Sequence, residues 1–89
     1  MNRQEVKDIV YEHLIGLFYD KHEFEIQMSQ YPNDGEDRQL YNEIRLDELD
    51  VITFINELEK AFNIQIDDYL FNHDCTVRNI IDYLYDKLK

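Results

Sequence analysis

Apolar residues recur every three or four positions in three stretches of the chain, which is the spacing of amphipathic helices that bury one face. The stretches cover residues 3 to about 20, 47–62 and 76–88. Each begins at or just after a residue type that favours a helix N-cap, and the expected caps are Asn2, Asp47 and Thr76. The expected core positions are Val6, Ile9, Val10, Leu14, Leu17 and Phe18, then Val51, Phe54, Ile55, Leu58, Ala61 and Phe62, then Val77, Ile80, Ile81, Leu84 and Leu88.

The segments between these helices have weaker patterns. Residues 21–46 look irregular, apart from a short alternating run at 24–28 that suggests an extended piece and turn-forming residues at 31–35. We expect this long loop to lie against the core, because it carries Leu40, Tyr41, Ile44 and Leu46. Residues 67–72 predict one short helical turn. The whole pattern predicts three main helices, one short helix and a long first loop, an all-α bundle.

Length and composition limit the possibilities further. With 89 residues, the chain has material for a single domain, residues 1–89. A single cysteine excludes an internal disulfide framework and any zinc site that needs several cysteines. No run of about 18 apolar residues is present, so no membrane span is expected. The N-terminal residues lack the apolar core of a signal peptide, which makes the cytoplasm the expected compartment. We expect a monomer.

The chain is strongly acidic, with a net charge of -11 from 20 acids and 9 bases. Residues 34–74 hold 12 of the acids and only 3 bases. Phosphate backbones and anionic membranes would be repelled, so neither nucleic acid nor membrane is an expected partner. A basic protein surface is the expected partner, although the acidic charge could also serve only to keep the surface solvated.

No residue pattern supports catalysis or metal binding. Cys75 precedes the last helix, a position that can activate a thiol, but no orienting group accompanies it, and we interpret it as a buried or half-buried structural cysteine. His13 lies on an apolar stripe and is interpreted as a core or boundary residue, while His22 and His73 complete no metal-ligand spacing. Ser29 has no triad context. The chain is therefore not expected to be an enzyme, and no metal or cofactor is expected.

One surface is not required by the core. Leu49 and Ile52 lie off the core stripe of the second helix and share a face with Asn56. Acidic residues surround them. An apolar strip edged by negative charge suits docking to a basic patch with an apolar centre; alternatively, Leu49 and Ile52 pack under the long loop. The candidate partner-binding residues are Asp47, Glu48, Leu49, Asp50, Ile52 and Asn56.

Residues 40–50, LYNEIRLDELD, resemble the signature of the acyl carrier protein family, in which a D-S-L tripeptide opens the second helix. The following ITFINELEKAFNIQI is similar to that family's second helix, and TVRNIIDYL to the start of its last helix. The resemblance covers about residues 40–88 without a gap. It implies a small acyl-carrier-protein-like four-helix bundle.

The resemblance also implies a lost attachment site. In the family, the serine of D-S-L is esterified by 4'-phosphopantetheine, and Glu48 stands at that position. A carboxylate has no hydroxyl to receive a phosphodiester, so no covalent phosphopantetheine is expected. Arg45 replaces the usual glycine, and Asn56 is polar where the family's docking face is apolar. Leu49, Ile52, Asp47 and Asp50 match that face.

Two functions follow from the resemblance. The first is a non-catalytic interaction module that docks basic partner proteins through the acidic face of the second helix. Acyl-transfer or other enzymes of fatty acid or polyketide biosynthesis are the partners that the family implies. The second is a protein that binds an acyl chain or lipid noncovalently between its helices, where each buried CH2 contributes about 0.8 kcal/mol.

Overall fold

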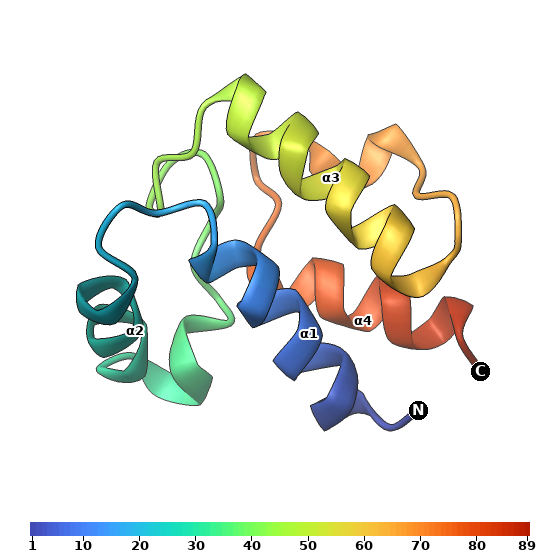
Figure 1. Cartoon of the computed structure of the whole chain (residues 1–89), viewed down its shortest axis with the longest axis horizontal. Coiled ribbons are helices and arrows are strands. Elements are labelled where there is room, and N and C mark those ends of the chain that lie inside the picture. The colour runs from blue at the N-terminus through green and yellow to red at the C-terminus, as the bar shows by residue number, and fades with distance from the viewer.

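The computed structural model describes residues 1–89 as an all-helical chain (Figure 1). The α-helices are α1 (Arg3–Ile15), α2 (Lys21–Ser29), α3 (Glu48–Phe62) and α4 (Val77–Lys87). Two 3-10 turns, η1 (Pro32–Gly35) and η2 (Asp68–Phe71), complete the elements. The only β-type pairing is an isolated antiparallel bridge between Gln39 and Thr76. The predicted all-α helical bundle is confirmed, and no helix is both long and apolar enough to cross a bilayer.

The three predicted N-caps are confirmed, and each forms a capping box. In α1, Asn2 Oδ1 accepts a hydrogen bond from the Glu5 amide at 2.8 Å, and Glu5 Oε1 accepts one from the Asn2 amide at 3.1 Å. Asp47 opens α3 and Thr76 opens α4 in the same way. These bonds satisfy first-turn amides that have no partner inside the helix, which fixes where each helix begins.

The region expected to be an irregular first loop contains a helix. Residues 24–28 are helical in α2 and not extended, because Phe24 and Met28 are both buried on one face, four residues apart. The side chain of Asp20 caps this helix by accepting from the Glu23 amide at 3.0 Å. Consequently α1 ends at Ile15 instead of near residue 20, and residues 16–20 form the connection.

The core lies where α1 packs against α3 and α4, and α1 separates α4 from α2 in Figure 1. The predicted core positions on α3 and α4 are buried, except that Ile55 and Leu88 are half-buried and Ala61 is exposed. Ala61 was predicted wrongly, because the buried face of α3 is the narrow stripe Val51, Phe54, Leu58 and Phe62. The expected burial of the long connection is confirmed at Leu40 and Leu46.

The buried carboxylate of Glu36 joins the segment between α2 and α3 to the helices α1 and α4. The Glu36 side chain, 4% exposed, pairs with Arg3 at 2.6 Å and Lys7 at 2.9 Å, both from α1. Arg78 of α4 lies 3.5 Å away and donates its backbone amide to the Glu36 carbonyl at 2.7 Å. Burial alone would raise the pKa of Glu36, but hydrogen bonds from Arg3 and Lys7 outweigh it and lower that pKa to about 2. The carboxylate is therefore charged and fixes the connection against α1 and α4.

Candidate functional site

The acids at the start of α3 cap the first turn of the helix and also make its surface negative. Asp47 Oδ1 accepts a hydrogen bond from the Asp50 amide at 2.7 Å, and Asp50 Oδ2 accepts one from the Asp47 amide at 3.3 Å. Both carboxylates lie at the positive end of the helix dipole. Charge changes at either residue therefore alter helix stability along with the surface, and neither gives a clean test of binding.

The apolar residues of this face are open to solvent. Leu49 is 73% exposed and Ile52 is 54% exposed, and Asn56 is also exposed. The interpretation in which Leu49 and Ile52 pack under the long loop is wrong, because both side chains are exposed while Leu40 and Leu46 of that loop are buried in the core. We call Glu48, Leu49, Ile52 and Asn56 the α3 face.

Glu48 is the first residue of α3, and its side chain makes no hydrogen bond or ion pair within the chain. Arg45, three residues before it, is exposed and has a φ of 68°, in the left-handed region. A residue with a Cβ costs roughly 1–2 kcal/mol in this conformation, whereas glycine adopts it freely. Arg45 is therefore an exposed cation without a carboxylate partner, held three residues before Glu48 in the chain at the expense of backbone strain.

The remaining chemically reactive residues are placed as structural ones. Cys75 is 1% exposed, and burial raises the pKa of its thiol to about 11, so its prediction as a structural cysteine is confirmed. His13 is half-buried at the boundary between α1 and α3, with Nδ1 lying 3.3 Å from Glu57 Oε2. The Ser29 hydroxyl donates to the Ile26 carbonyl at 2.8 Å. No group of three His, Cys, Asp or Glu side chains is placed to hold a metal ion.

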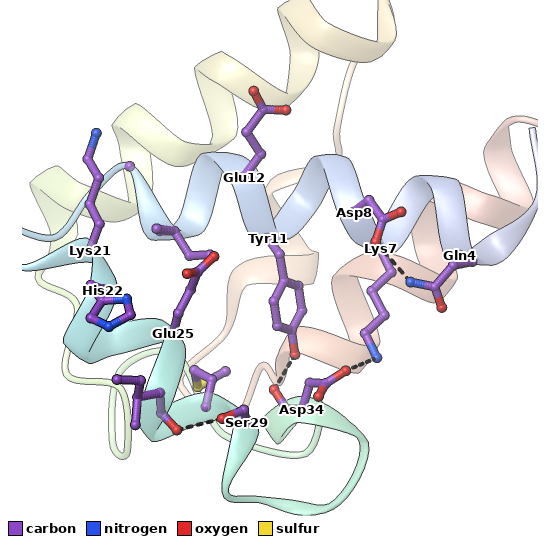
Figure 2. Close-up of a pocket in the computed structure, with 14 residues that line it drawn as sticks. Gln4, Lys7, Asp8, Tyr11, Glu12, Lys21, His22, Glu25, Ser29 and Asp34 are labelled. Atoms are coloured by element: carbon purple, nitrogen blue, oxygen red, sulfur yellow. Dashed lines mark hydrogen bonds and ion pairs between the residues drawn. The ribbon is translucent and has the colours of Figure 1, made fainter.

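One concave region was not predicted from the sequence, because it depends on α2. A groove of about 790 Å³ lies between α1 and α2, and most of the residues that line it are polar or charged (Figure 2). At one end, the Tyr11 hydroxyl donates to the Asp34 carbonyl at 2.5 Å, and Lys7 Nζ lies 3.0 Å from the Asp34 carboxylate. Burial raises the pKa of Tyr11. These bonds hold the turn at η1 against α1, so the polar groups at this end of the groove are already partnered.

A small helical bundle whose second long helix begins at an acidic cap beside an exposed apolar face has the layout that the sequence resemblance implies. The family described as "phosphopantetheine attachment site" matches residues 23–84, which is well over half of the chain. The chain belongs to this family of acyl-carrier-like domains, as its sequence predicts. No curated protein is similar enough to the chain to count as a match.

Proposed function

We propose that the chain is a non-catalytic interaction module that docks a basic protein surface through the α3 face, without carrying phosphopantetheine. The observation that supports it most is the exposure of Leu49 and Ile52 directly beside the unpaired carboxylate of Glu48. Exposed apolar side chains at the centre of a charged surface are typical of protein interfaces. The net charge of -11 favours a partner of the opposite sign.

The alternative, noncovalent acyl binding, has less support. An acyl chain needs a dry apolar cavity, because its affinity comes from the burial of CH2 groups. The groove between α1 and α2 is open to solvent and is lined mainly by polar and charged residues, so it is no dry cavity. The interior between α1, α3 and α4 is filled by side chains such as Phe54, Leu58 and Ile81, which have no exposed surface. The surface of α3 is the better candidate.

The absence of covalent phosphopantetheine can be measured directly. We expect the intact mass to stay unchanged after coexpression with a promiscuous phosphopantetheinyl transferase, because Glu48 offers no hydroxyl. We also expect Glu48→Ser to be modified poorly while Arg45 remains beside it, and the Glu48→Ser/Arg45→Gly double variant to be modified more fully. A gain of one phosphopantetheine mass by the unaltered chain would refute this part of the proposal.

Docking through the α3 face predicts that one exposed isoleucine matters and another does not. The protein is immobilised and exposed to a lysate of its source cells. We expect the unaltered chain to retain a protein from the lysate that the Ile52→Glu variant does not retain. Ile26→Glu is the matched control, because Ile26 is a similarly exposed isoleucine at 45%, compared with 54% for Ile52, but lies on α2. Mass spectrometry of the bound fractions measures the difference.

The identified partner then allows the two components of binding to be separated. Glu48→Gln removes one charge without removing a cap, so it should slow association, and added salt should slow association of the unaltered chain. Ile52→Ala should instead speed dissociation, because an apolar side chain acts after contact. Equal loss of binding by Ile52→Glu and Ile26→Glu would show that the α3 face is only a solvated surface.

A further inference from the structure

A second, smaller groove is lined by four aromatic side chains. It encloses about 370 Å³ where the α1–α2 connection, α2 and residues 43–44 meet. We call it the aromatic groove, and the side chains that define it are Phe18, Tyr19, Phe24, Met28, Tyr31 and Ile44. Three of its four aromatic rings come from the connection and from α2, the elements whose structure the sequence pattern did not reveal.

The floor of the aromatic groove is ordered, and its edges are exposed. The Phe18 and Phe24 rings stack with their centroids 3.9 Å apart and their planes 11° from parallel. Tyr19 is fully exposed and Tyr31 is also exposed. Exposed tyrosines beside a preformed apolar pocket are typical of the residues that dominate binding energy at protein interfaces, because a tyrosine buries a large area with few rotatable bonds.

The charged residues around the aromatic groove favour an occupant with positive charge. Asp20, Glu23 and Glu43 line it, against the single cation Arg38. The guanidinium of Arg38 already lies over the Tyr31 ring, 4.1 Å from its centroid, and forms no ion pair with any carboxylate. This cation–π contact holds the only cation of the lining against Tyr31. The remaining acids leave the lining with an excess of negative charge.

We infer that the aromatic groove is a second docking site, and that its occupant is a basic amphipathic segment of a protein partner. Apolar side chains of that segment would enter between Tyr19 and Tyr31, with its lysines or arginines against Glu23 and Glu43. The inference shares with the proposed function only the basic character of the partner. Its residues are separate from the α3 face, so each site can fail without the other.

A synthetic probe tests the groove without knowledge of the partner. The probe is an amphipathic helix of about five turns built only from leucine and lysine, and its control has the same lysines with every leucine replaced by serine. In titrations followed by amide NMR, we expect the first peptide to shift signals of residues 18–31 and the control peptide to leave them in place. Tyr19→Ala should weaken binding of the first peptide at least about fivefold.

Matched variants decide the outcome. Tyr69→Ala is the control for Tyr19→Ala, because Tyr69 is a similarly isolated tyrosine, 72% exposed, on η2; it should leave the affinity unchanged, and Tyr19→Phe should restore most of it. Equal effects of Tyr19→Ala and Tyr69→Ala, or equal binding of both peptides, would overturn the inference. Loss of peptide binding by Ile52→Glu but not by Tyr19→Ala would place the peptide on the α3 face and overturn the inference. Loss by Tyr19→Ala but not by Ile52→Glu would support the aromatic groove and leave the α3 face to the test with its own partner.

Discussion

Replacing Glu36 with alanine is expected to lower the free energy of unfolding by about 3 kcal/mol, the lower end of the range for breaking a buried ion pair. Removing one partner of a buried ion pair leaves the opposite charge without compensation, and the most buried of these cations is Lys7, whose side chain is 11% exposed. Glu36 pairs with Arg3 and Lys7 and lies near Arg78, and those cations retain only the more exposed carboxylates of Asp82, Asp34 and Asp37. Urea denaturation followed by circular dichroism measures the loss.

The same carboxylate predicts an acid dependence of stability with a definite sign. Its pKa is lowered from 4.5 to about 2 in the folded chain, so below pH 4.5 the unfolded chain binds a proton that the folded chain does not. The stabilisation is complete above pH 4.5 and is lost as the pH falls towards 2. A shift of this size corresponds to on the order of 3 kcal/mol. We expect Glu36→Gln to show a flatter decline of stability than the unaltered chain in this window.

Asp82→Asn is the control for both measurements. Asp82 also pairs with Arg3, at 2.8 Å, but its side chain is 51% exposed, and exposed ion pairs contribute about 1 kcal/mol or less. If Asp82→Asn and Glu36→Ala cost the same, burial of Glu36 does not determine its contribution. A Glu36→Gln curve parallel to that of the unaltered chain would assign the acid dependence to other carboxylates.

The periodic pattern predicts α1, α3 and α4, and it fails at α2 for a physical reason. The three predicted helices bury regular stripes and begin at strong capping boxes, which are signals local to the sequence. Helix α2 has nine residues and buries only Phe24 and Met28. Its stability depends on the stack with Phe18 and on its position against α1 and η1, and these contacts arise from tertiary structure. The aromatic groove was missed along with it.

The sequence predicts which residues form the α3 face, but it does not predict whether they are exposed to solvent. Spacing places Leu49 and Ile52 off the core stripe, yet it does not determine whether the preceding loop covers them, so both interpretations stayed open. Burial of Leu40 and Leu46 decides the matter, because these residues draw the loop into the core and leave the α3 face uncovered. The strain at Arg45 is likewise a backbone property that no hydrophobic pattern records.

Truncating the buried stripe of α3 is expected to have the other large effect. Phe54 and Leu58 have no exposed surface, and replacement by alanine should cost about 3–5 kcal/mol at Phe54 and about 2–5 kcal/mol at Leu58, because each change removes apolar contacts and leaves a cavity. Phe62→Ala and Ile81→Ala should cost amounts in the same ranges. Small domains can have as little as about 5 kcal/mol of stability, so these variants should retain little of it, and their urea midpoints, followed by circular dichroism, should fall far below that of the unaltered chain.

Ile52→Ala on the same helix separates packing from helix propensity. It exchanges an exposed residue for a better helix former, so the free energy of unfolding should change by no more than about 0.5 kcal/mol. A loss at Ile52 as large as at Leu58 would mean that α3 presents a different face to the core. The α3 face would then be part of the interior, and both its exposure and the docking proposal built on it would be wrong. An Ile52→Ala variant as stable as the unaltered chain, beside a strongly destabilised Leu58→Ala variant, fixes the rotation of α3 that exposes Glu48, Leu49 and Ile52 together.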